Sequence, residues 1–439
     1  MNVLILSPIS LSMFLVPRLN QEKDIEKIYF WTRDTTMKCA GKGMENVKDW
    51  EKFELVSDYN EVLNKHKPSD IIIFIDDIGM GHTGKHLRDL GYKVIGGGVF
   101  MDRLEDERQL ATDLMKKVMD VPESTSFKSF DEGIRFVKNF EPDERLLFKP
   151  NDSDAPKEYT YLAKDVDDLV EAMQSFKAEW KYKEDFQIQK FIKGTEVDFS
   201  AYFNGKEYLT NSMVIYFENK PLMPGDIGPA TGGAIAVEFC RKPDEIFWPI
   251  LEKLKPVMIK DDYKGQVSIN CIVSDEDKKP YFLEFCSRVG YPSLPLDVTL
   301  LEENKKSVWD LFKAIVNGEN PDLFPTDKIA VTASIFVPPA PNGAAPQINE
   351  SQGEPIDWDI KYDRYFFPYY IMWDEKMCLA GISSWVGQVT SVDSTIDGAI
   401  QTLYDTYMPT LRLKDKIYRN DLGDSAKERM KKLHDYKII

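Results

Sequence analysis

Four short apolar runs in the first hundred residues place the strongest limit on how this chain folds. They lie at 3–6, 28–31, 71–75 and 94–95, and helical segments separate them. Strands without a polar face are typical of a parallel sheet that helices cover on both sides. The sequence therefore predicts an N-terminal α/β domain over residues 1–100, with a helix at 82–90 that follows a glycine turn.

The rest of the chain has a different pattern, in which strands are joined by turns. We predict a second domain over 101–325 and a β-rich domain over 326–439, with residues about 122–193 as a separate lobe of the second. The expected strands lie at 186–192, 197–203, 207–216, 266–273, 281–288 and 330–337; the expected helices lie at 102–119, 245–261 and 396–407; and 221–233 is expected to be a loop rich in glycine and proline.

Composition narrows the class of protein. The chain has 439 residues, of which 43% are hydrophobic and 12% aromatic, enough for large cores. The formal net charge of −17 argues against free nucleic acid as a partner, because like charges repel. No apolar run reaches the ~18 residues of a membrane span. The five cysteines show no CxxC spacing, so we expect reduced thiols in a cytoplasmic protein.

One segment imitates a nucleotide-binding loop. Residues 79–85 fit the spacing G-x-x-x-x-G-K, and an apolar strand precedes them. The next position should be serine or threonine, whose hydroxyl binds Mg²⁺, but it is His86. We therefore interpret the segment as a glycine turn into a helix, with Lys85 on the solvent side.

The hairpin 266–288 carries polar side chains on one face. Because side chains alternate along a strand, Glu284, Cys286 and Arg288 share a face, and the neighbouring strand presents Asn270. A surface salt bridge explains this pattern, and so does a carboxylate that holds Mg²⁺ on a nucleotide beside a neutralising cation.

Two further strand ends carry candidate binding groups. Lys149 ends an apolar strand and is suited to binding phosphate as a point charge. The strand that includes Gln189, Lys190, Phe191 and Ile192 could offer backbone groups to a flat base, and Glu196 could accept hydrogen bonds from sugar hydroxyls. Taken singly, each is equally compatible with an ordinary strand end.

The order of these features resembles the ATP-grasp superfamily, and within it phosphoribosylamine–glycine ligase. Residues 225–233, GDIGPATGG, resemble the family's GDTGPNTGG loop, and 283–290, LEFCSRVG, resemble its LEFNVRFG segment. Residues 387–390 and 418–423 resemble its C-terminal GVT and YRRDIG segments. The resemblance covers nearly the whole chain in the family's order.

The resemblance implies a mixed α/β and α+β architecture: an ATP-grasp fold between an N-terminal α/β (pre-ATP-grasp) domain and a C-terminal β-rich domain. It implies ATP and Mg²⁺ or Mn²⁺ as cofactors, and a small amino acid and an amine acceptor as substrates. The implied nucleotide-binding residues are Arg108, Lys149, Gln189, Lys190, Phe191, Ile192 and Glu196. The implied metal ligands are Asn270, Glu284 and Cys286, and Asp226 and Arg288 would face the substrates.

The chain differs from the family at four places, one of which is the acidic pair after the glycine of the 283–290 segment, replaced here by Tyr291 and Ser293. The N-terminal GxGGREHA loop, which serves phosphoribosylamine, is replaced by 5–12, ILSPISLS; the lid loop 151–157 contains no glycine; and cysteine replaces the metal-binding asparagine at position 286. Three functions therefore stay open: a carboxylate–amine ligase with another substrate, a divergent phosphoribosylamine–glycine ligase, and an inactive nucleotide-binding scaffold. The sequence also leaves open whether the protein is a monomer or a dimer.

Overall fold

The computed structural model describes residues 1–33, 39–151, 159–182, 185–340 and 348–439. The chain divides into two compact units. Unit 1 comprises Met1–Asp102, Val197–Ser268 and Cys286–Ile439, and unit 2 comprises Arg103–Glu196 and Ile269–Phe285. The predicted boundaries of the three domains stay a prediction, and each unit is described by itself.

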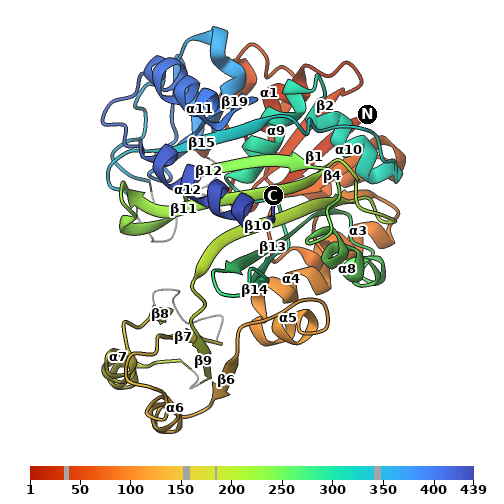
Figure 1. Cartoon of the computed structure of the whole chain (residues 1–439). Coiled ribbons are helices and arrows are strands. Elements are labelled where there is room, and N and C mark those ends of the chain that lie inside the picture. Colours follow the sequence, from red (N-terminus) through yellow and green to blue (C-terminus); the bar gives the residue numbers. More distant parts are fainter. Residues whose placement is uncertain (34–38, 152–158, 183–184, 341–347) are drawn as a thin grey trace. The chain divides into compact units, whose positions relative to one another are not determined.

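Unit 1 begins with a five-stranded parallel sheet of order β3-β2-β1-β4-β5 (Figure 1). Leu4 and Ile73 pack with α2 and α3, whereas Phe74 contacts Phe312 of α10 with ring centroids 4.8 Å apart. Helices thus cover both faces, which confirms the predicted α/β region. The elements are β1 (Asn2–Leu6), α1 (Leu15–Asn20), β2 (Lys27–Trp31), β3 (Phe53–Val56), α2 (Tyr59–Lys65), β4 (Ile71–Ile75), α3 (Gly81–Asp89), β5 (Lys93–Ile95), α4 (Val99–Asp106) and α10 (Val308–Asn317).

A mainly antiparallel sheet of eight strands has the order β14-β13-β10-β11-β12-β15-β19-β16. Along the chain, β10, β13 and β14 each pass from one unit into the other. Its strands are β10 (Gly194–Phe203), β11 (Met213–Met223), β12 (Ile227–Arg241), β13 (Gly265–Ser274), β14 (Pro280–Cys286), β15 (Ile329–Phe336), β16 (Phe366–Pro368) and β19 (Trp385–Asp393). The other elements of unit 1 are α8 (Trp248–Lys260), α9 (Ser293–Glu303), β17 (Ile371–Asp374), β18 (Lys376–Leu379), α11 (Ile396–Gln401) and α12 (Leu422–Asp435).

Two predictions for this sheet were wrong. The return strand expected at 207–216 begins only at Met213, because the Asn204 side chain accepts hydrogen bonds from the N–H groups of Lys206 and Glu207 and holds a wider turn. The expected loop 221–233 is the end of a long hairpin, in which β11 and β12 pair from Met213↔Arg241 to Met223↔Ile227. Register shifts near Pro221 accommodate the proline within the ladder.

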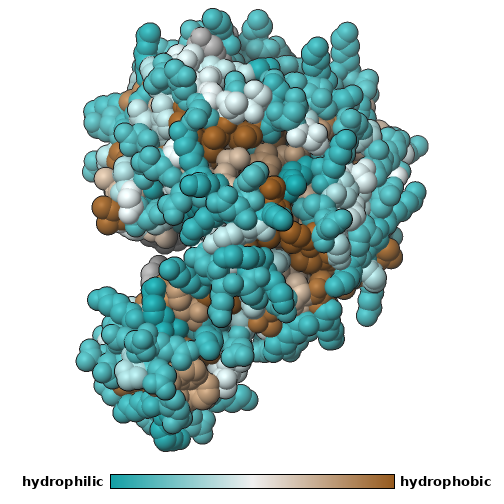
Figure 2. Space-filling model, in the orientation of Figure 1, coloured by the Kyte–Doolittle hydropathy of each residue, from teal (hydrophilic) through white to brown (hydrophobic). Residues whose placement is uncertain are grey.

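Two expected helices are broken. The segment 102–119 forms α4 and α5 (Arg108–Met115), with Glu107 between them. The segment 396–407 forms α11, which continues as a wider π-helical turn over Thr402–Tyr407. None of the helices in the described ranges has the length and apolar character that crossing a membrane requires. The face drawn in Figure 2 carries mainly hydrophilic side chains.

Unit 2 contains a four-stranded antiparallel sheet of order β6-β9-β7-β8, against which α6 and α7 pack. Its elements are α5, β6 (Ser124–Phe127), α6 (Phe130–Val137), β7 (Leu146–Pro150), β8 (Tyr161–Leu162), α7 (Val166–Glu179) and β9 (Phe186–Lys190). Aromatic rings dominate its core: Phe148 is fully buried among Phe130, Phe186, Phe176 and Trp180, with ring centroids 4.8–6.0 Å away. This core supports the strand that carries Lys149.

We expect Phe148→Ala to destabilise the protein by about 3–5 kcal/mol, because it removes buried surface and leaves a cavity among four rings. The measurement is the free energy of unfolding from denaturant titration of the full chain. Leu162→Ala on the neighbouring strand β8 is the control, since Leu162 is 40% exposed. Equal losses in the two variants would contradict the aromatic core.

Candidate nucleotide site and its surroundings

Lys149 is a buried cation on strand β7. Only 8% of the residue is exposed, and its Nζ donates to Gln189 Oε1 on β9 at 3.0 Å. Burial lowers the pKa of its ammonium to about 8, and the Arg108 guanidinium also lowers it. Glu284 and Glu196 act in the opposite direction. A buried lysine that lies near a second cation, here Arg108, is suited to binding an anionic ligand.

The other residues predicted to bind nucleotide, and the predicted metal ligands Asn270 and Glu284, also belong to unit 2, whereas Cys286 belongs to unit 1. Arg108 is partly buried, and desolvation lowers its pKa while the Glu284 carboxylate raises it. Asn270 Nδ2 donates to Glu196 Oε1 at 3.1 Å, so the predicted metal ligand and the predicted ribose acceptor touch. Strands β7, β9, β10, β13 and β14 and helix α5 bring these side chains together from distant parts of the sequence.

The donor set fits a metal ion that a nucleotide carries. Within the described ranges, no three or more histidine, cysteine, aspartate or glutamate side chains cluster as a metal site. Mg²⁺ is commonly bound by one or two carboxylates together with substrate phosphates and water. Glu284, which is exposed, and the buried Asn270 amide match that pattern. Cys286, which is partly buried and forms no disulfide, adds a soft ligand that Mg²⁺ does not favour.

In the strand predicted to bind the base, two backbone N–H groups already donate hydrogen bonds within the protein and are not available to a ligand. The Lys190 N–H donates to the Glu123 carbonyl at 2.9 Å, and the Phe191 N–H donates to the Arg145 carbonyl at 3.2 Å. The Arg145 guanidinium also lies over the Phe191 ring, 4.4 Å from its centroid. These two N–H groups are thus occupied, and any base must be recognised by the following residues, such as Ile192, or by carbonyl oxygens.

Two cavities of unit 2 lie at these residues. One measures about 10 Å³ and is lined in part by Arg108, Lys149, Gln187 and Gln189, and the other measures about 420 Å³ and is lined in part by Glu123, Ile188 and Lys190. Pockets for small molecules generally measure about 300–1,000 Å³. Residues 152–158, which include most of the glycine-free lid loop, lie outside the described residues.

Arg288 follows the end of β14 in unit 1 and does not continue the strand as predicted. Its Nε lies 3.6 Å from Asp77 Oδ1, and its guanidinium lies 4.1 Å from the centroid of the Tyr291 ring. The Tyr291 hydroxyl donates to the same Asp77 oxygen at 2.9 Å. The Arg288 side chain therefore contacts Asp77 at the carboxyl end of strand β4, a contact that the sequence analysis did not predict.

Asp226 lies in the turn between β11 and β12 and is held by polar contacts. Arg419 Nη1 donates to its Oδ1 at 2.7 Å, and Asn219 Nδ2 donates to both of its oxygens at 2.9 and 3.0 Å. Arg419 is 1% exposed and also pairs with Asp421. These contacts anchor the hairpin to the C-terminal segment. The similarity of residues 418–423 to the family motif was the sequence signal that could have indicated this contact. The predicted contact of Asp226 with substrate stays a prediction.

The segment that imitates a nucleotide-binding loop is a packing feature. Lys85 Nζ pairs with Asp89 at 2.8 Å on the exposed side of α3. The Gly81 N–H at the start of α3 donates to Asp102 at 2.6 Å, so a carboxylate already occupies the helix terminus. A Cβ at Gly84 would lie 2.2 Å from the Gly97 carbonyl oxygen, which explains the glycine there.

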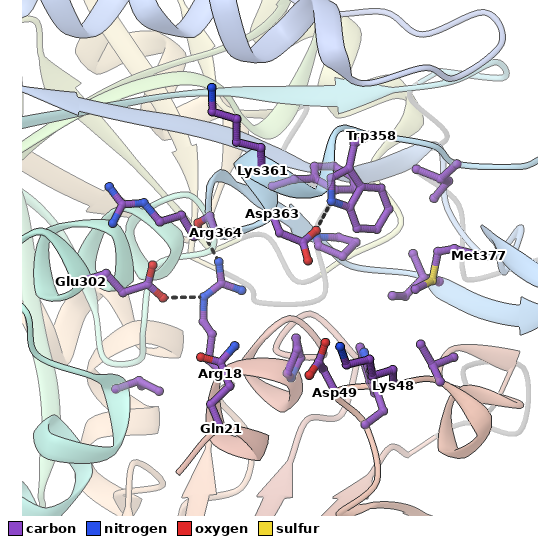
Figure 3. Close-up of a pocket in the computed structure, with 18 of the residues that line it drawn as sticks. Arg18, Gln21, Lys48, Asp49, Glu302, Trp358, Lys361, Asp363, Arg364 and Met377 are labelled. Atoms are coloured by element: carbon purple, nitrogen blue, oxygen red, sulfur yellow. Dashed lines mark hydrogen bonds and ion pairs between the residues drawn. The ribbon is translucent and has the colours of Figure 1, made fainter.

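Sequence reasoning did not identify a cavity of about 780 Å³ in unit 1, shown in Figure 3. Arg18 projects into it, donates to Glu302 at 3.0 Å and to the Arg364 carbonyl at 2.8 Å, and lies over the Phe367 ring. Trp358 donates to Asp363 on the opposite wall. Acidic and basic side chains both line this cavity, so its charge favours no class of ligand.

Sequence reasoning also missed a polar cluster where strands β1 and β4 end. Ser7 and Ser12 hydroxyls both donate to Asp76 Oδ2 at 2.5 Å, and Asp76 is 1% exposed. Burial raises the pKa of the Asp76 carboxyl to about 7, with a further increase from Asp77. Polar residues directly after two neighbouring parallel strands were the signal that could have revealed it.

Known proteins of similar sequence and fold are ligases. No protein-family model matches the chain. Phosphoribosylamine–glycine ligase of Streptococcus pneumoniae serotype 4 is 22% identical over 437 residues, which cover 94% of this chain and 96% of that protein. The crystal structure of the Thermotoga maritima phosphoribosylamine–glycine ligase has a TM-score of 0.70 at 18% identity, and the match covers 96% and 100% of the two chains.

A second solved structure contains the nucleotide product. The biotin carboxylase domain of the Hydrogenobacter thermophilus 2-oxoglutarate carboxylase, in complex with MgADP and bicarbonate, has a TM-score of 0.61 at 11% identity, covering 99% of this chain and 97% of that chain. These likenesses confirm the predicted fold class. The chain therefore has the ATP-grasp fold of these solved structures, and over nearly its whole length its sequence is similar to that of phosphoribosylamine–glycine ligase.

Proposed function

We propose that this protein is an ATP-dependent carboxylate–amine ligase that activates a small amino acid and joins it to an amine other than phosphoribosylamine. The observation that carries the proposal is the buried Lys149 beside Arg108, with Glu196, Asn270 and Glu284 around it. One buried and one partly buried cation, together with a carboxylate–amide pair, are suited to phosphates that carry a divalent cation. The ligase names of the relatives support the same reaction class.

The residues have separate roles in this proposal. Lys149 and Arg108 bind the phosphates of ATP, Gln189 and Ile192 lie by the base, and Glu196 accepts from the ribose. Glu284 and Asn270 would hold Mg²⁺, which neutralises charge on the phosphates when bound. Arg288 would bind the carboxylate of the amino acid, because a guanidinium matches a carboxylate with two parallel hydrogen bonds.

The reaction would have two steps. A carboxylate oxygen of the acid attacks the γ-phosphorus of ATP, which breaks the bond to ADP and forms an acyl phosphate. The neutral amine then attacks the acyl carbon, loses a proton and expels phosphate, which leaves an amide. The protein contributes position and charge neutralisation in both steps.

The choice against phosphoribosylamine depends on the N-terminal loop. Ser7 and Ser12 occupy the loop after β1, and their hydroxyls are held by Asp76. A phosphate there would meet two aspartates, Asp76 and Asp77, and no glycine backbone that could approach it closely. The relatives' own substrate is the second candidate, which the 22% identity over nearly the whole chain favours.

The test is an assay of ADP release with ATP, Mg²⁺ and a panel of amino acids and amines. One reaction contains glycine with phosphoribosylamine generated in situ. We expect ADP release that needs both an amino acid and an amine from the panel. Efficient formation of glycinamide ribonucleotide would instead establish the relatives' activity. If ATP with Mg²⁺ raises the unfolding temperature but no combination from the panel releases ADP, the protein is an inactive nucleotide-binding scaffold.

A further inference from the structure

The carboxyl ends of strands β1 and β4 lie where the strand order of the parallel sheet reverses. The order β3-β2-β1-β4-β5 runs outward in both directions from this pair. In open α/β sheets, ligands bind at the carboxyl ends of the two strands at such a reversal. Ser7 follows β1 directly, and Asp76 and Asp77 follow β4 directly.

Asp76 has one carboxylate oxygen that the protein does not use. Its Oδ2 accepts from the hydroxyls of Ser7 and Ser12, whereas its Oδ1 is buried and accepts no hydrogen bond within the described ranges. A buried acceptor without a partner costs free energy, which a ligand that donates to it would recover. Arg288 faces Asp77 at 3.6 Å, so this cluster of two carboxylates and one guanidinium retains an excess negative charge.

The cavity at Asp76 limits the size and chemistry of such a ligand. It measures about 10 Å³, and Leu11, Phe14, Val289, Tyr291 and Leu294 line it together with Asp76. That volume holds about one group of the size of a water molecule. A guanidinium or a phosphate is too large, and an alkali ion would find too few oxygen ligands among these apolar walls. A primary ammonium group has the right size, charge and number of hydrogens.

We propose that Asp76 binds the primary ammonium group of a small substrate at the carboxyl ends of β1 and β4. The identity of that molecule as a ligase substrate rests on the proposed function, but its binding does not. The ammonium could belong to the activated amino acid or to an acceptor with a second, protonated amine, because the attacking amine must be neutral. A diamine represents the second source, and glycine represents the first.

The test is calorimetric titration of the full chain without ATP, at pH 8 and constant chloride, with glycine, 1,4-diaminobutane or KCl against a sodium background. We expect glycine or 1,4-diaminobutane to bind and KCl to release no heat of binding. Asp76→Asn should weaken that binding tenfold or more, because it removes the charge and preserves the shape. Asp89→Asn, an exposed carboxylate on α3, is the matched control and should bind as the wild type does.

A second measurement uses the wild-type protein alone and so does not depend on how a variant folds. The charged and titratable groups that face Asp76 are Asp77, Arg288, Tyr291 and Tyr370, and both tyrosines have raised pKa values, far from neutral pH. Since the Asp76 pKa is about 7, its carboxyl is mostly protonated at pH 6 and mostly ionised at pH 8. Affinity for the ammonium ligand should therefore be about tenfold weaker at pH 6 than at pH 8.

Three results would overturn the proposal: no binding of either ammonium ligand to the wild type, equal binding by potassium, or unchanged affinity in Asp76→Asn together with no change between pH 6 and pH 8. A failed ligase assay with intact amine binding would remove the proposed function and leave this site. Normal ADP release, with amine binding that does not depend on Asp76, would support the proposed function and remove this ammonium site.

Discussion

Replacing Lys149 by methionine is expected to weaken ATP binding at least about tenfold, since a hydrogen bond to a charged group contributes roughly 1.5–3 kcal/mol. Methionine keeps the length and apolar character of the lysine stem, and only 8% of the residue is exposed, so β7 should stay packed. The variant also removes the repulsion between Lys149 and Arg108. Because it also removes the hydrogen bond to the buried Gln189 side chain, its unfolding temperature in the absence of nucleotide should stay near that of the wild type.

The measurement is the dissociation constant of ATP with Mg²⁺ by calorimetry. Lys85→Ala is the control, because Lys85 belongs to the segment that imitates a nucleotide-binding loop and pairs only with a surface aspartate in the described contacts. A large loss in Lys85→Ala with no loss in Lys149→Met would place the nucleotide at α3 and end the proposed role of unit 2.

Glu284→Gln is expected to lower the rate of ADP release at least about 100-fold, because preorganised charge at a phosphoryl-transfer site is generally worth that much. Glutamine has the shape of glutamate without the anionic ligand that Mg²⁺ requires. Glu284 is exposed, so the fold should tolerate the change. The rate is measured over a range of Mg²⁺ and Mn²⁺ concentrations.

Two companion variants sharpen this result. Glu179→Gln, at the exposed end of α7, changes the net charge of unit 2 by the same amount as Glu284→Gln. It should leave the rate of ADP release unchanged. Cys286→Asn should preserve or raise the apparent affinity for Mg²⁺, since an amide oxygen is a harder ligand than a thiol. Full activity in Glu284→Gln would show that the metal is held by other residues.

The residues of the candidate nucleotide site were proposed from their order along the chain, and their roles in binding stay a prediction. Lys149, Glu196, Asn270 and Glu284 were each ambiguous singly, since an isolated polar residue on a strand is usually only solvated. The structure shows Asn270 in contact with Glu196, and Lys149 within the field of Glu284. Such contacts between residues more than 70 positions apart depend on the register of strands, which a single sequence does not reveal.

Hairpins and their contacts were predicted less well. Glycines and prolines at 221–233 indicated a loop, yet the backbone continues as paired strands, because neighbouring strands can override local preferences. Asp226 illustrates the consequence: its partners Arg419 and Asn219 lie 193 and 7 positions away, and only the folded chain shows them together.

The sequence by itself determined the parallel N-terminal sheet, since its strands are apolar on both faces and must be covered by helices. It also determined the order of the candidate binding residues along the chain, on which the resemblance to the ATP-grasp superfamily rests. The tertiary structure decided where polar groups from separate strands meet, as at Asp76 with its two serines. The reason is physical: periodicity within one element reports which face is buried, whereas the partner of a buried charge is chosen by packing between elements distant in sequence.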